Sequence, residues 1–358
     1  MSEEVKPAEL LARSRQLQAA ARATSTRRSC DHWWWVFTEF CVEVGWAQAA
    51  GEVPLPVPAR VMELWVVWLS RKYAESTISI SLAAISAVHA GYSLQSPTGG
   101  ALIRSLLEGV AWTGAVRGVA EAVTVTPDHL RAFVQLTVAW TEAGQEWSPL
   151  RLKRAVAMVV IGFMAYLRKS EVGELDVCDV TREADCTKVR VCKAKNDPVG
   201  RGRVTIVGAA CGDSREMEQT LWTWMDAAEL TRSARCSKSA DPRRRCMACG
   251  PLFPRLGGAV VKASSTPMGK SALTEELRGL YRACKRVGSV PQDLEVRRYS
   301  AIALRRGGNS AAAAAGVSGI LRASHGRWRS EVTPDQSYTF IHKAEMIGLA
   351  TTMLKPRL

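Results

Sequence analysis

The side chains best suited to take part in a reaction are arginine, lysine and tyrosine residues that lie far apart in the sequence. Arg168 ends an apolar segment, Arg305 opens an Ala-rich segment, and Tyr338 is the last tyrosine of the chain. A guanidinium group stays charged and pairs with two phosphate oxygens at once, and a tyrosine hydroxyl is a nucleophile. Lys195, between the two arginines, can supply a proton to a leaving oxygen. These residue types could break a phosphodiester bond without a metal ion.

Four short motifs carry these residues, and their order is more informative than any one of them. The sequence Leu-Arg-Lys-Ser-Glu alone is an ordinary end of an amphipathic helix, so a single motif is weak. Four motifs in order, followed by a late tyrosine, are hard to obtain by chance. The motifs occupy residues 166–171 (YLRKSE), 192–197 (CKAKND), 302–308 (IALRRGG) and 326–330 (GRWRS).

This order of motifs resembles the tyrosine recombinase (phage integrase) family over residues 126–345. The resemblance implies a strand transferase that cuts and rejoins DNA through a 3′-phosphotyrosine intermediate, without metal or cofactor. Its catalytic residues would be Arg168, Lys195, Arg305, Trp328 and Tyr338, with Lys193 as the alternative lysine. The Arg-Arg-Gly-Gly and Gly-Arg-Trp variants look most like the recombinases of eukaryotic mobile elements, the crypton and DIRS-type groups.

Supporting roles follow from the same resemblance. Glu171 would be the carboxylate that assists the first arginine, Arg306 would assist the second, and His325 would be a substitute for a missing histidine. That histidine belongs to the family's second motif, where this chain has Ile302, which cannot accept or donate a proton. The alternative function is therefore an inactive or domesticated descendant that only binds DNA. A helical scaffold protein with chance motifs is a third interpretation.

The elements that must position these residues indicate a mainly α protein with a small β-sheet. We expect an all-helical core-binding (SAM-like) domain over residues 1–118, a linker over 119–125 and an α+β catalytic domain over 126–358. Thr126-Pro127-Asp128 is typical of a helix start, with an N-cap, a proline at the first position and an acid in the first turn. β-branched runs at 189–192 and 204–207 around an Asn/Asp/Pro/Gly cluster predict a hairpin.

The N-terminal domain is predicted to contain four or five helices, with proline breaks at residues 54–58. One helix, from about 30 to 45, carries Trp33, Trp34 and Trp35. These three could form a stacking platform for bases. Aromatic residues at helical spacing are more often core, so at least two of the three are expected to be buried.

The formal charge of +14 over 358 residues points to a polyanionic partner. We expect double-stranded DNA, with self-association into a dimer or tetramer on it, and neither a membrane nor a small-molecule substrate. Apolar runs are too short to span a bilayer, and the N-terminus lacks a secretory pattern. The location would be nuclear in a eukaryote and cytoplasmic otherwise. Residues expected to contact DNA are Arg243, Arg244, Arg245 and Arg327.

Ten cysteines without a framework indicate free thiols in a reducing compartment. Cys236, Cys246 and Cys249 suggest zinc, which takes four ligands. No fourth His or Cys stands at a convincing spacing, since Cys211 and Cys284 are remote. A loop with free thiols is therefore the preferred interpretation, and no metal is expected.

Overall fold

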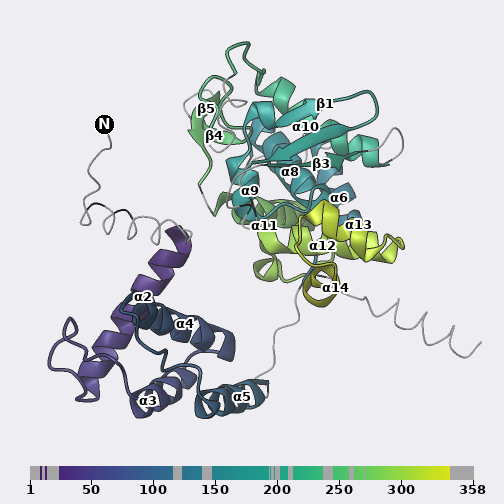
Figure 1. Ribbon diagram of the computed structural model, residues 1–358. Coiled ribbons are helices and arrows are strands. Elements are labelled where there is room, and N and C mark those ends of the chain that lie inside the picture. The colour runs from purple at the N-terminus through teal and green to yellow at the C-terminus, as the bar shows by residue number, and fades with distance from the viewer. Residues whose placement is uncertain are drawn as a thin grey trace, which may run out of the picture. The chain divides into compact units, whose positions relative to one another are not determined.

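The computed structural model describes residues 24–115, 123–138, 147–192, 202–208, 213–236, 245–257, 262–269 and 271–338, together with residues 9, 13, 194 and 197. The chain divides into two compact units, Met1–Glu121 and Ala122–Leu358 (Figure 1). The expected fold class, mainly α with a small β-sheet, is confirmed. In the part of the chain described, no helix is long and apolar enough to cross a membrane.

The N-terminal unit contains four described helices: α2 (Thr24–Glu43), α3 (Ala59–Ser70), α4 (Glu75–Gly91) and α5 (Ala101–Ala115). Their apolar faces form one core around Trp65, whose indole Nε1 donates to Ser81 Oγ at 3.2 Å. Trp33 is buried and Trp34 is partly buried against this core, whereas Trp35 is 59% exposed. The expectation that most of the tryptophan run belongs to the core is thus confirmed for its first two members.

The second unit is built around one apolar helix, α8 (Pro149–Met164), whose residues 155–161 are all buried. It packs against α6 (Pro127–Val138), α10 (Asp213–Ala227), α11 (Ala272–Arg286) and α12 (Ala301–Ala314). The predicted start of α6 is confirmed, because Thr126 Oγ1 accepts from the backbone N–H of His129 at 3.3 Å. Because these helices surround α8, apolar side chains around its whole circumference are buried.

A three-stranded antiparallel sheet follows the short helix α9 (Lys169–Glu174) and the turn η1 (Val177–Asp179). Its strands are β1 (Val180–Arg182), β2 (Thr187–Val191) and β3 (Arg203–Val207), with Val189 opposite both Val180 and Thr205. The predicted hairpin is the β2–β3 pair. The strands β1, β4 (Pro254–Gly257) and β5 (Lys262–Pro267) were not predicted; they are short, and β5 is mostly polar.

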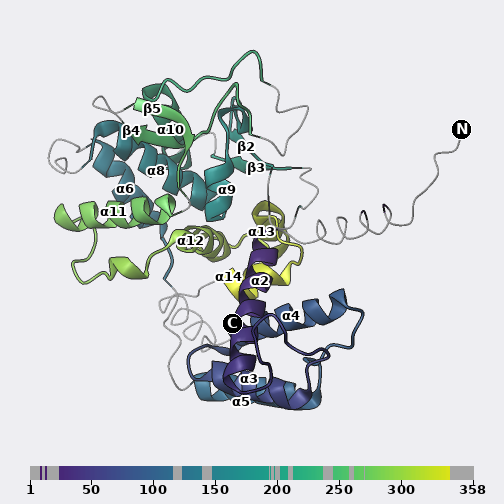
Figure 2. The ribbon, with the colours of Figure 1, turned by 90° about the vertical axis from the view of Figure 1, so that its left-hand side faces the viewer.

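The remaining elements are the turn η2 (Val296–Arg298) and the helices α13 (Gly319–Gly326) and α14 (Val332–Tyr338). The three helices α12, α13 and α14 contact one another and lie side by side in both views (Figures 1 and 2). The motif of residues 302–308 lies on α12, the motif of residues 326–330 begins at the last residue of α13 and continues into the turn before α14, and Tyr338 ends α14. Consequently the motifs of residues 302–338 are neighbours in space.

Candidate active site

Two glycines bring α12 against the end of α8 and so bury Arg305. A Cβ atom at Gly307 would collide with the carbonyl oxygen of Val125, and one at Gly308 with the carbonyl oxygen of Phe163. Only a residue without a side chain allows two backbones to approach so closely. Arg305, in the same segment of the helix, is fully buried.

The guanidinium group of Arg305 lies at the centre of the candidate site. It donates hydrogen bonds to the carbonyl oxygens of Tyr166 and Gly326, the second at 2.6 Å. Its Cζ lies 4.2 Å from the ring centroid of Trp328 and 5.4 Å from that of Tyr338. Its Nε is buried and has no hydrogen-bond partner among the residues described. Burial lowers the pKa of Arg305 to about 10, so the group is still charged at neutral pH.

One carboxylate, Glu171, contacts three guanidinium groups. Its Oε1 accepts from Arg168 at 2.7 Å, its Oε2 accepts from Arg327 at 3.0 Å, and Arg305 Nη1 is 4.0 Å from Oε2. The side chain of Glu171 is 1% exposed, so water screens these pairs weakly. One negative charge cannot neutralise three positive charges. The cluster is therefore suited to an additional anion.

The turn after α13 folds Trp328 back over Gly326. Arg327 ends the helix in the left-handed region, with φ of +59°, and a Cβ at Gly326 would collide with the indole ring. Trp328 is 6% exposed, and its Nε1 has no hydrogen-bond partner within the described segments. A buried N–H without an acceptor is costly in the unliganded protein and is available to a bound oxyanion.

Tyr338 is held near this cluster by contacts of α14 with the two preceding helices. Ser310 Oγ donates to the Tyr338 carbonyl oxygen at 3.2 Å, and Arg322 pairs with Asp335 at 2.6 Å. The rings of Tyr338 and Trp328 have centroids 5.0 Å apart. The tyrosine that ends the described chain thus lies beside the buried arginine and the indole.

His325 lies between α8 and the sheet, next to the arginines. Its Nε2 is 2.7 Å from the carbonyl oxygen of Met164, so Nε2 carries the proton and donates. Its Nδ1, 3.1 Å from Thr205 Oγ1, then accepts from that hydroxyl. Burial lowers the pKa of His325, and the charges of Arg327 and Arg305 act in the same direction. The imidazole is therefore neutral and fixed in one tautomer.

Two further residues of the second motif lie on α12. Ile302 is 37% exposed, one turn before Arg305, and Arg306 is partly buried. The site that contains Arg305 therefore has no imidazole at residue 302. His325 is the expected substitute for a histidine at residue 302, and both of its ring nitrogens have protein partners.

Other predicted residues lie elsewhere or outside the described chain. Lys193, Lys195, Arg243 and Arg244 are among the residues not described, as is most of the expected linker. Arg245 pairs with Asp176 at 2.9 Å, and its contact with DNA stays a prediction. Arg327, expected to contact DNA, is 2% exposed. Its guanidinium donates to Glu171 and to the carbonyl oxygens of Ala165 and Tyr166, so it has internal partners in place of a surface position.

Two residues that hold the site together, Asn309 and Arg322, were not expected from the sequence. Asn309 is fully buried; its Nδ2 donates to the carbonyl oxygen of Pro334 at 3.2 Å, and its Oδ1 accepts from Arg322. Both side chains therefore connect α12 and α13 to α14. The available signal was the position of Asn309 directly after the glycine pair, on the helix face that carries Arg305 one turn earlier.

No protein-family model matches the sequence, and neither does any curated protein. Solved structures do match. A XerH site-specific recombinase bound to a palindromic difH substrate shares 13% identity over 89% of this chain and 76% of its own, with a TM-score of 0.57. The Tn1549 transposon integrase in complex with transposon right end DNA shares 14% identity over 98% and 95%, with a TM-score of 0.53. A lambda integrase dimer bound to a core site shares 12% identity over 95% of this chain and 100% of its own, with a TM-score of 0.51. The chain has the two-domain fold of the tyrosine recombinases.

Proposed function

We propose that this protein is a site-specific DNA recombinase that uses Tyr338 as its nucleophile. The observation that carries the proposal is the convergence of Arg168, Arg305 and Arg327 on one carboxylate, with the Tyr338 ring 5.4 Å from Arg305 Cζ. An excess of buried positive charge beside a tyrosine suits a phosphodiester under attack. The recombinase fold and the net charge of +14 support the same conclusion.

In the proposed reaction, the Tyr338 hydroxyl oxygen attacks the phosphorus atom and its proton is lost to solvent. A 3′-phosphotyrosine bond forms and the bond from phosphorus to the 5′ oxygen breaks. Arg168, Arg305 and the Trp328 indole N–H would stabilise the charge that develops on the non-bridging oxygens. Lys195 would protonate the 5′ oxygen. A 5′ hydroxyl of another strand reverses the reaction, which conserves the bond energy and needs neither metal nor cofactor.

The proposal extends to the context of the reaction. The substrate is double-stranded DNA, on which the protein assembles as a dimer or tetramer. Integration or excision of a mobile element is the process that fits, with crypton-type and DIRS-type elements as the closest pattern. We expect the protein to act in the nucleus of a eukaryotic cell and in the cytoplasm otherwise. Salt-sensitive binding is expected, because each neutralised phosphate releases counterions.

Covalent capture on DNA tests the proposal. Random-sequence duplexes with a single nick are incubated with wild-type protein, Tyr338→Phe and the control Tyr92→Phe, which changes a 69% exposed tyrosine of the other unit. The nick lets the short product diffuse away, so the covalent protein–DNA adduct accumulates and resists SDS. We expect adducts with wild-type and Tyr92→Phe protein alone. Adducts at wild-type level with Tyr338→Phe would refute the assignment of the nucleophile.

A second candidate function, DNA binding without cleavage, is favoured by one observation. Ile302 stands where the family has a histidine, and it cannot transfer a proton. Retained binding without adducts would support this function. Ile302→His then separates two cases. If adducts appear, the protein is a decayed enzyme that lost this histidine. If no adducts appear, the cause of the lost cleavage activity lies at other residues.

A further inference from the structure

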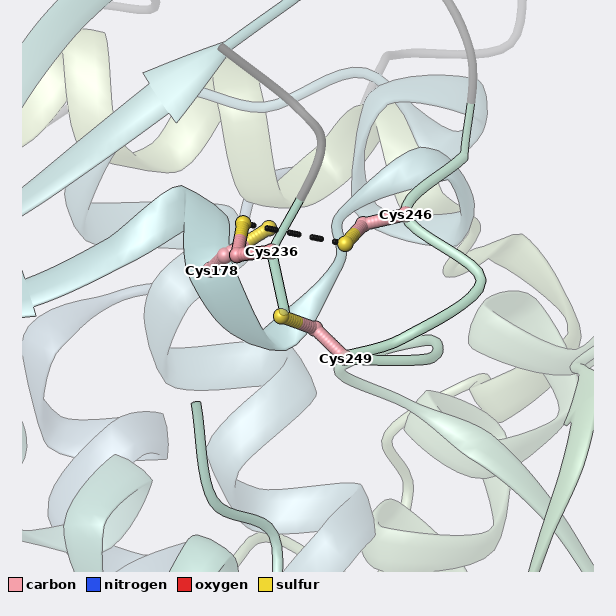
Figure 3. Close-up of side chains that lie close together, drawn as sticks. All are labelled: Cys178, Cys236, Cys246 and Cys249. Atoms are coloured by element: carbon pink, nitrogen blue, oxygen red, sulfur yellow. Dashed lines mark hydrogen bonds between the residues drawn. The ribbon is translucent and has the colours of Figure 1, made fainter. Parts of the chain in front are cut away.

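Four cysteines that are scattered in the sequence meet at one point of the second unit (Figure 3). Cys178 lies in the turn η1, directly after α9. Cys236 follows α10, and Cys246 and Cys249 lie in the turn before β4. Sequence spacing suggested the last three and offered no fourth ligand. The fold supplies Cys178 as the fourth.

The four sulfur atoms have the spacing of a single metal centre. All lie within 4.8 Å of one another, and the Sγ atoms of Cys236 and Cys246 are 3.7 Å apart. A tetrahedral Zn²⁺ with Zn–S bonds of about 2.3 Å spaces its sulfur ligands about 3.8 Å apart. Two disulfides would explain close pairs, but they give no reason for both pairs to share one point. An iron–sulfur cluster inserts its own atoms between the ligands and requires a wider arrangement.

Backbone and side-chain contacts that do not involve sulfur hold the cysteines in these positions. Asp176 Oδ2 accepts from the backbone N–H of Cys246 at 2.8 Å, and the N–H of Val177 donates to the carbonyl oxygen of Gly250 at 3.1 Å. The N–H of Gly250 in turn donates to the carbonyl oxygen of Cys246 at 2.8 Å, and Gly250 has a φ of +71°. The Cys-x-x-Cys-Gly turn is thus fastened to η1 before any ion binds.

We propose that Cys178, Cys236, Cys246 and Cys249 bind one structural Zn²⁺. Four protein ligands leave no open position, so the ion is structural and takes no part in catalysis. It connects Cys236 and the turn of residues 246–249 to η1, which follows Arg168 and Glu171. Loss of the ion would release these contacts and lower the stability of the unit. Zinc would be bound whether or not Tyr338 cleaves DNA.

The experiment measures metal in the full chain without an affinity tag. Protein produced with zinc in the medium and kept in a non-thiol reductant is dialysed and analysed by mass spectrometry of the elements. We expect about one zinc per chain in the wild type. Cys178→Ser and Cys246→Ser should lose most of it, while Cys30→Ser, a partly exposed cysteine of the other unit, keeps it. A chelator should lower the Tm of the wild type and of Cys30→Ser.

Cobalt substitution supplies a second readout. Co²⁺ bound by four thiolates has strong charge-transfer bands, which should appear with the wild type and disappear with Cys178→Ser. Wild-type protein that contains no metal after zinc loading overturns the proposal, even where the variants fail to fold. Stoichiometric copper or iron overturns the choice of zinc. Protein isolated without reductant could instead contain no metal and have the lower mass of a chain with disulfides among these cysteines. That result overturns the site.

Discussion

Glu171→Gln removes the one negative charge shared by three arginines and replaces one of its two acceptor oxygens by an amide NH2. Glutamine has the same shape, and its side-chain oxygen can still accept from either the backbone N–H or the guanidinium of Arg168. The ion pair with Arg327 at 3.0 Å and the charge facing Arg305 are lost. Three guanidinium groups are then held together without this counter-charge, in a place where Glu171 itself is 1% exposed.

The expected loss of stability is large because the pair is buried. Removal of one partner of a buried ion pair costs about 3–5 kcal/mol, since the other charge stays desolvated. The hydrogen bond that glutamine retains places this substitution near the lower end, at about 3 kcal/mol. In a unit of this size each kcal/mol shifts the Tm by about 2–4 °C, so we expect a fall of about 6–12 °C.

Differential scanning calorimetry of the full chain measures this shift. Glu174→Gln is the matched control, because Glu174 is on the same short helix, its side chain is 41% exposed and its carboxylate is 3.9 Å from Arg245. Exposed pairs contribute about 0–1 kcal/mol, so the control should shift the Tm little. Equal shifts for the two variants would refute the reasoning that Glu171 neutralises the arginine cluster.

The pH dependence of the same pair of proteins gives an independent check. Burial raises the pKa of Glu171, but Arg327 and the backbone and side chain of Arg168 outweigh burial, and the net pKa is below its ordinary value of 4.5. As the pH falls, Glu171 is therefore protonated in the unfolded chain before it is protonated in the folded protein. The stabilisation by its charge is complete above pH 4.5 and is lost as the pH falls through the folded pKa. The difference in stability between wild type and Glu171→Gln should shrink in that acid range. A constant difference would contradict the assignment.

Two further substitutions separate stability from catalysis. Burial lowers the pKa of His325 below 6.5, so this group alone should cost the wild type up to about 1.4 kcal/mol per pH unit as the pH falls from 6.5 toward the folded pKa. His325→Gln should reduce this slope in denaturant titrations, with a residual slope from His129, whose pKa burial also lowers; an unchanged slope would contradict a neutral His325. Trp328→Phe keeps a ring over Arg305 and removes the unpartnered N–H, so stability should change by less than about 1.5 kcal/mol while covalent capture of DNA falls about 100-fold. Unchanged capture, with the same stability, would exclude a role for the indole N–H.

The helices and the main hairpin could be predicted because their signals are local. Apolar spacing, the proline after Thr126 and β-branched runs each depend on a few neighbouring residues, and the structure confirms them. The strand β5, Lys262–Pro267, has no apolar alternation to reveal it. Its partner β4 is the preceding strand, with Gly257 opposite Lys262, so the pairing itself is local. The hairpin was missed because β4 holds a proline and a glycine within four residues, which weakens any strand signal.

The residues that meet at the candidate site could be named from the sequence, but their contacts could not. Arg168, Arg305, Trp328 and Tyr338 stand in motifs with a fixed order, but only the fold shows which of them share Glu171. Arg327 illustrates the difference: from the sequence it is a motif residue expected to contact DNA, and in the structure it is 2% exposed and pairs with that carboxylate. The partner is distant in the sequence, so spacing could not have identified it.

The same distance hid the fourth cysteine. Cys246 and Cys249 are close in the sequence, and their spacing is a recognised metal signal, whereas Cys178 belongs to a different segment that follows the motif of residues 166–171. Asp176 links the two segments by accepting from the backbone of Cys246 and from Arg245. A ligand set completed by tertiary structure cannot be read from spacing, even when most of its members are noticed.

The residues that make the site recognisable in the sequence are also those that strain the unliganded protein. The glycines at 307, 308 and 326 allow backbones and the indole to approach so closely that Arg305 loses all contact with water. Its Nε and the Trp328 Nε1 have no hydrogen-bond partner among the residues that the structure describes, and Glu171 balances only part of the positive charge. Each of these features costs stability on its own. A phosphate oxyanion would provide the missing acceptors and the missing charge at once, so the folding of this unit and the binding of a phosphodiester should stabilise each other.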